Sequence, residues 1–207
     1  MNRHLLLFLG PCVVALMAFF AAPVWQTFVM SMHADSMAPN PAYVGLSNYI
    51  AVISDRNFTR LMTTSVIYTV GNVFFVWLFG LGIALLLNRN FFGRGLIRTA
   101  FIIPWAMPYV AASLVFALMF NYDVGILNYL LSLVSSGQLR IDYLTSCPNA
   151  LISLTGISVW KLLPLGIVMM LSGLQSVPDS QYEAAEVDGA TALQRFWFVT
   201  LPGLRST

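Results

Sequence analysis

Four long runs of apolar residues constrain this chain more than any other feature of its sequence. They span approximately residues 5–32, 61–87, 99–120 and 150–174. Each is as long as the roughly 20 residues that a helix needs to cross the hydrocarbon core of a bilayer. The runs are too long and too evenly apolar for half-buried strands, which disfavours a transmembrane barrel. We therefore predict an all-α membrane protein, a polytopic helical bundle with four transmembrane helices in this chain.

The composition excludes several other classes of protein. Hydrophobic residues make up 58% of the 207 positions and charged residues only 9%, whereas an average soluble domain has about 25% charged residues. A soluble domain needs a polar surface that this composition cannot supply. A soluble enzyme, a nucleic-acid binder and a disordered chain are thus excluded. Two cysteines and two histidines are too few for a disulfide framework, and we expect no metal site.

The arginines between the runs predict the orientation in the membrane. Segments 1–4, 88–98 and 175–207 hold six arginines, against three in segments 33–60 and 121–149. The six are Arg3, Arg89, Arg94, Arg98, Arg195 and Arg205. Because Lys and Arg concentrate in cytoplasmic loops, the N-terminus and the tail after the fourth run are predicted to be cytoplasmic. A cleaved signal peptide ending near Ala21-Ala22 is an alternative that leaves the downstream orientation unchanged.

Polar residues inside the second and third runs have two interpretations each. Tyr68 and Asn72 are four residues apart and lie on one helix face. They either hydrogen-bond to another helix or line a solute path. In the third run two prolines flank Trp105, and Tyr109 follows. The prolines predict a kinked helix, and the two aromatic residues are either interface anchors or part of a cavity.

Lys161 is the only charged residue well inside a run. Because a charge is costly there, it should face protein or a water-filled cavity. Three roles stay open: its stem reaches toward the membrane surface, it forms a structural pairing, or it lies on a solute path. The candidate path residues are therefore Tyr68, Asn72, Trp105, Tyr109 and Lys161.

A short acidic segment follows the fourth run. Pro178 should end that helix, and Ser180 with Glu183 has the spacing of a capping box that starts a new one. Alanines give the new helix a face with little bulk, and Gly189 permits a sharp turn. A helix of this kind, projecting from a membrane protein, is expected to dock on a partner.

This segment resembles a known motif. Glu183-Ala184-Ala185 is followed by Gly189, then by nine residues, Val199 and Leu201-Pro202. The pattern resembles the EAA loop in permease subunits of bacterial binding-protein-dependent ABC importers. Val199 stands where isoleucine is usual. Further segments resemble the carbohydrate branch of that family, the maltose and glycerol-phosphate type. They are residues 44–49, Arg98 with 103–105, residues 125–128 and Trp160-Lys161.

The resemblance implies a type I importer fold and a mechanism. The EAA loop, about residues 176–202, would sit in a groove of a cytoplasmic ATPase, with Glu183 facing basic groups and Gly189 fixing the bend. Alternatively, Glu183 caps its own helix; both roles can hold together. The implied coupling residues are Glu183, Ala184, Ala185, Asp188, Gly189 and Pro202. We find no phosphate-binding loop in the sequence, so ATP and Mg²⁺ are expected on the partner ATPase, with no cofactor and no catalytic residue here.

The resemblance also implies partners and a domain plan. The partners are an ATPase dimer, a second homologous permease, a periplasmic or lipid-anchored solute-binding protein and membrane lipid, in the bacterial inner membrane. We expect residues 1–60 to form the first helix with a periplasmic segment, and residues 61–207 to form the permease core. Such permeases continue with two further spans after Leu201-Pro202, making six, so we expect this chain to be truncated. A sugar-like solute is favoured; the alternatives are a polyamine or phosphate ester, or a membrane-embedded transferase.

Overall fold

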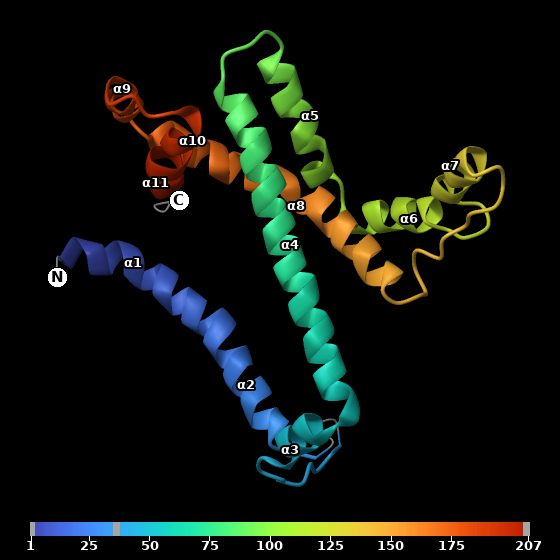
Figure 1. Ribbon diagram of the computed structural model, residues 1–207. Coiled ribbons are helices and arrows are strands. Elements are labelled where there is room, and N and C mark those ends of the chain that lie inside the picture. The colour runs from blue at the N-terminus through green and yellow to red at the C-terminus, as the bar shows by residue number, and fades with distance from the viewer. Residues whose placement is uncertain (1–2, 35–37, 205–207) are drawn as a thin grey trace. The chain divides into compact units, whose positions relative to one another are not determined.

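The computed structural model describes residues 3–34 and 38–204 (Figure 1). Within these ranges the chain is built from helices, and the one β contact is an isolated bridge between His33 and Tyr43. It divides into two compact units, residues 1–63 and 64–207. Asp35 and Arg205 lie outside the described residues. The predicted all-helical fold is confirmed for the part that the structure describes.

The first unit contains the first predicted span. Helix α1 (Arg3–Leu16), a π-helical turn (Met17–Ala21) and α2 (Ala22–Ser31) follow one another without a break. Residues Phe8–Ser31 of this run are long and apolar enough to cross a membrane. The short helix α3 (Ser47–Ser54) is held to its end, because the Asn48 amide donates to the Ser31 carbonyl over 2.8 Å and the Tyr49 hydroxyl lies 2.6 Å from that of Ser31.

In the second unit, α4 (Arg56–Asn88, of which residues 64–88 belong here) packs closely against α8 (Asn149–Ser176). A Cβ atom at Gly80 would lie 3.3 Å from the backbone carbon of Gly166, and one at Gly166 would lie 2.7 Å from Val76 Cγ1. Small residues permit such close approach in lipid, where packing rather than the hydrophobic effect joins helices. The buried core beside this contact consists of Ala84, Leu87, Ile167, Leu171 and Leu174.

The third run is broken, where the sequence predicted only a kink. Helices α5 (Arg94–Ala106) and α6 (Tyr109–Met119) are bent by 93° (Figure 1). Pro108 has no N–H to donate to the Pro104 carbonyl four residues earlier, so the helical ladder cannot continue. The backbone of Met107 is extended. In the part of the chain that the structure describes, three helices are long and apolar enough to cross a membrane, or four if the bent pair counts as one span.

Beyond α6, a hydrogen-bonded lobe leads back to α8. Helix α7 (Ile126–Val134) carries the buried Asn128, whose amide donates to the Tyr122 and Ile141 carbonyls and whose oxygen accepts from the Ile141 N–H. In the loop that follows, the Thr145 hydroxyl donates to Asp142, and the Thr145 and Leu144 N–H groups add two further bonds. These bonds lower the pKa of Asp142, the Thr145 hydroxyl contributing most.

The chain then ends in four short elements: α9 (Asp179–Val187), α10 (Ala192–Arg195), a π-helical turn (Phe196–Thr200) and α11 (Leu201–Gly203). Pro178 separates α9 from α8, as predicted. The predicted capping role of Ser180 is wrong. Helix α9 begins at Asp179 with Pro178 as its cap residue and no side-chain capping bond, so Ser180 already lies within the first turn. The capping box forms one element later, between Thr191 and Gln194 at the start of α10.

The contact between α4 and α8 gives a prediction with a matched control. Gly80→Leu would force side-chain atoms into the Gly166 backbone, and overpacking of this kind costs about 1–3 kcal/mol. Gly82, on the same helix, has no atom within 4 Å of its Cβ position. We expect Gly80→Leu to lower the thermal unfolding midpoint of the detergent-solubilised protein by several degrees relative to Gly82→Leu. Equal midpoints would contradict this packing.

Candidate functional site: the loop around α9 and the polar groups of the spans

Helix α9 ends in a tight reversal at Gly189. The Gly189 φ angle is +77°, in the left-handed region that favours glycine. The Ala190 N–H donates to the Ala185 carbonyl over 2.9 Å, and the Gly189 N–H donates to the Glu186 carbonyl over 3.0 Å. These two bonds form a Schellman motif, which satisfies the last carbonyls of the helix. The sharp turn predicted at Gly189 is therefore present.

Two side-chain contacts fix one side of α9 to the elements that follow. The Tyr182 hydroxyl lies 3.2 Å from that of Thr200, which is buried. Arg195 forms an ion pair with Glu186 at 2.6 Å. Exposed pairs of this kind contribute at most about 1 kcal/mol each. Together, the Tyr182 and Glu186 contacts restrict rotation of α9 about its axis. They therefore determine which face of the helix points away from the following elements.

The side chains on another side of α9 form no hydrogen bond or ion pair with the rest of the described chain. Its exposed members are Glu183, Ala184, Val187 and Asp188. Val187 is 89% exposed, so an apolar side chain stands in the middle of this side of the helix. We call these four residues the outer face of α9. Ala185 is half-buried, and Pro202 is exposed in the first turn of α11.

Sequence reasoning missed Val187. The EAA pattern directs attention to Glu183 and the alanines, whereas Val187 falls between the motif residues. Helical spacing was the available signal, because residues 183 and 187 are four apart and share a face.

Of the two predicted polar groups of α4, Tyr68 is paired with α8 and Asn72 is not. The Tyr68 hydroxyl lies 2.6 Å from that of Ser158, and the Asn72 amide donates to the Tyr68 carbonyl over 2.8 Å. Asn72 is only 7% exposed, and its side-chain oxygen is buried without a hydrogen-bond partner. A buried acceptor left unpaired costs about 1–3 kcal/mol. It therefore marks a position where a donor from another group would be favourable.

Lys161 lies where α5 ends. Its ammonium donates to the carbonyls of Pro104 (2.8 Å), Trp105 (3.2 Å) and Met107, and lies 4.8 Å from the centre of the Tyr109 ring. Its side chain is buried, while the side chains of Trp105 and Tyr109 are exposed. The five predicted path residues thus form two groups: Tyr68 with Asn72, and Lys161 with Trp105 and Tyr109. Whether they touch solute stays a prediction.

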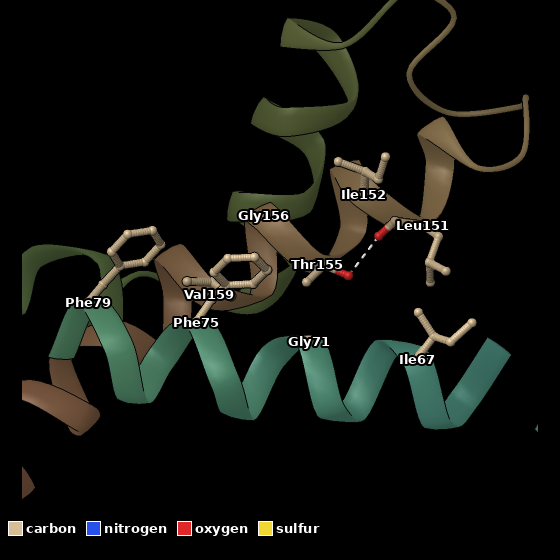
Figure 2. A pocket seen from close by; sticks show the side chains of 9 residues that line it. All are labelled: Ile67, Gly71, Phe75, Phe79, Leu151, Ile152, Thr155, Gly156 and Val159. Carbon is tan, nitrogen blue, oxygen red and sulfur yellow. Dashed lines mark hydrogen bonds between the residues drawn. The ribbon is translucent and has the colours of Figure 1, made fainter. Parts of the chain in front are cut away.

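A groove of about 430 Å³ runs between α4 and α8 within the second unit (Figure 2). Figure 2 shows Phe75, Phe79 and Val159 along one part of it. The Thr155 hydroxyl in its wall donates to the Leu151 carbonyl over 2.7 Å, so even this polar group is already paired. The remaining lining residues are Ile67, Gly71, Ile152 and Gly156. Sugar recognition requires polar partners, so this groove suits apolar groups instead.

No cluster of three or more His, Cys, Asp or Glu side chains occurs in residues 3–34 and 38–204. The candidate site consists of the exposed outer face of α9 and of two groups in the spans. The first group is Tyr68 with Asn72, and the second is Lys161 with Trp105 and Tyr109.

Comparison with known proteins identifies the family. Residues 76–207 match the family model described as the inner membrane component of binding-protein-dependent transport systems. The trehalose/maltose transport system permease protein MalF of Thermococcus litoralis is 35% identical over 196 residues, covering 94% of this chain and 66% of that protein. The sulfoquinovosyl glycerol transport system permease protein SmoG of Agrobacterium fabrum is 34% identical, covering 96% and 65%.

A third relative and a solved structure are also similar to this chain. The sn-glycerol-3-phosphate transport system permease protein UgpA of Agrobacterium fabrum is 31% identical, covering 97% of this chain and 68% of that protein. A chain of a bacterial alginate ABC transporter, crystallised with an alginate-bound periplasmic protein, has a TM-score of 0.77 at 20% identity and shares the fold. The alignment covers 95% of this chain and 65% of that one.

The chain spans about two thirds of the length of these relatives. The matched residues include α8, the loop around α9 and residues 76–88 of α4. This chain belongs to the family of inner membrane components of binding-protein-dependent transport systems, and it is a multi-pass membrane protein.

Proposed function

We propose that this chain is part of a permease subunit that imports a sugar or sugar-like solute in an ATP-driven ABC transporter. The outer face of α9 carries this proposal, because it is a small, exposed and rigidly presented surface in a family of transport components. The relatives named for transport of trehalose, maltose and sulfoquinovosyl glycerol support the solute class.

In the proposed mechanism, α9 couples the membrane helices to a cytoplasmic ATPase dimer. The outer face sits in a groove of the ATPase, where Glu183 faces basic groups and Ala184 permits close approach. ATP and Mg²⁺ bind to the ATPase. When that dimer closes, the force reaches α8 through Pro178 and through Gly203, which packs on Val177 beside the end of α8.

The remaining partners follow from the same proposal. A second homologous permease completes the path, and a periplasmic or lipid-anchored binding protein delivers the solute. We place the N-terminus and α9 in the cytoplasm. The arginines of segments 88–98 and 175–207 follow the second and fourth apolar runs, and arginines concentrate in cytoplasmic loops.

We further propose that Tyr68, Asn72, Trp105 and Tyr109 lie on the solute path. Neutral sugars are bound by hydrogen bonds and by aromatic faces, and these residues supply both kinds of group. The exposed rings of Trp105 and Tyr109 are the strongest support, and the unpaired oxygen of Asn72 could accept from a sugar hydroxyl only if helix movement exposed it. A contact between Lys161 and solute stays a separate prediction, since its ammonium already has three carbonyl partners.

Cross-linking tests the coupling role in the full-length parent, assembled with its ATPase. A cysteine at Ala184 should form a disulfide with a cysteine in the ATPase groove, and Ala184→Trp should abolish ATPase association because its bulk prevents close approach. The matched control is Ala192→Trp, another exposed alanine of the loop that lies outside the outer face. Both variants should insert normally into the membrane.

The turn at Gly189 provides a second arm of the same test. Asparagine tolerates positive φ, whereas a β-branched residue does not. Gly189→Asn should therefore retain most uptake, and Gly189→Val should lose it, although neither side chain would meet another atom within 4 Å at its Cβ. If Ala184→Trp and Gly189→Val both transport normally, the loop does not couple to the ATPase.

The solute path is tested at Asn72. Asn72→Leu removes the unpaired oxygen at similar volume, and losing one neutral hydrogen bond should raise KM for uptake about two- to tenfold. Ser158→Ala, which removes the hydroxyl partner of Tyr68, is the control for a purely structural contribution. An unchanged KM in Asn72→Leu, with normal amounts of protein in the membrane, would remove Asn72 from the path.

A further inference from the structure

The α5–α6 break, residues 104–109, leaves backbone carbonyls without helical donors. In a continuous helix the Pro104 carbonyl would accept from the N–H of residue 108, which is a proline and has none. The Trp105 carbonyl would accept from the N–H of Tyr109, but α6 starts there in a new direction. Unpaired carbonyls are costly in a bilayer, where no water replaces the lost donors.

Lys161 supplies the missing donors. An ammonium group has three N–H bonds, and Lys161 donates to three carbonyls of the break: those of Pro104, Trp105 and Met107. The positive charge also lies at the C-terminal end of α5, where the helix dipole is negative. The face of the Tyr109 ring, 4.8 Å away, is attractive to a cation as well.

These contacts explain why a lone charge is buried inside a span. Lys161 is 4% exposed, and the partners of its ammonium are three backbone carbonyls and the Tyr109 ring. The charge of Lys161 is therefore compensated by carbonyl dipoles and a ring rather than by a carboxylate.

We propose that Lys161 is a positioning residue that holds the α5–α6 break and thereby sets the direction of α6. The long stem reaches from α8, so it ties α8 to the end of α5 and to Met107, the extended residue after which the chain enters α6. The edge-to-face contact of Phe116 with Trp160, whose ring centroids are 5.0 Å apart, adds a second attachment of α6 to α8. Through this geometry Lys161 also places the Tyr109 ring. The inference concerns the fold alone and does not depend on which solute is carried.

Distance measurements between spin labels test the proposal in the intact chain, with Cys12→Ser and Cys147→Ser removing the native thiols. One label replaces Leu96 on α5 and the other Leu118 on α6; both side chains are exposed. We expect a narrow distance distribution with Lys161 present. In Lys161→Met the distribution should broaden toward longer distances, because the carbonyls lose their donors and the break is no longer held.

Pro108→Ala combined with Lys161→Met provides the decisive second variant. Alanine restores the N–H that pairs with the Pro104 carbonyl, so the helix can become continuous. The labels should then move to the separation of a straight helix, about 33 Å for 22 residues. In this variant the carbonyls of Pro104, Trp105 and Met107 can regain helical donors, so it is expected to fold even if Lys161→Met alone does not accumulate.

Phe116→Leu is the matched control, since it removes the contact with Trp160 and leaves the carbonyls paired. Its distance distribution should stay close to that of the parent. An unchanged bend in the double variant would overturn the proposal, and so would a Phe116→Leu effect as large as that of Lys161→Met.

Discussion

Every buried backbone polar group in a bilayer must find its partner within the protein, and this constraint organises the second unit. Helices α4 and α8 meet most of it by remaining continuous, although Pro164 removes one bond of the α8 ladder, and glycines let the two helices touch. Helices α5 and α6 cannot, because Pro108 interrupts the ladder. The ammonium of Lys161 replaces the lost donors at that point. The same contact accounts for both the right-angled bend and the buried charge.

The loop around α9 is stabilised differently, because it lies outside the spans. Its shape depends on local bonds: the Schellman motif at Gly189, the capping box of Thr191 and the ion pair of Glu186 with Arg195. None of these bonds involves the outer face, which is left free for a partner. A stiff loop attached to the end of α8 can transmit a displacement, whereas a flexible one would absorb it. This stiffness is what the proposed coupling to an ATPase requires.

Much of this architecture was predictable from the sequence, and the rest depended on contacts distant in the chain. Apolar run length predicted the spans, and the Glu183-Ala184-Ala185 and Gly189 pattern predicted the family and the turn. The capping role of Ser180 was wrong because α9, with Pro178 as its cap residue, begins two residues earlier than the spacing implied. Proline positions predicted a kink, but its size depends on Lys161, which lies 57 residues from Pro104. The unpaired oxygen of Asn72 likewise arises from packing that periodicity cannot show.

The central claim is that the outer face of α9 joins this family member to an ATPase. A side-chain-resolution cryo-electron microscopy map of the full-length parent, with its ATPase and second permease, tests it most directly. The account predicts α9 in a groove of the ATPase, with Glu183 beside basic side chains and Val187 buried against the partner. A map in which α9 is exposed to solvent, while the ATPase contacts another segment, would contradict it.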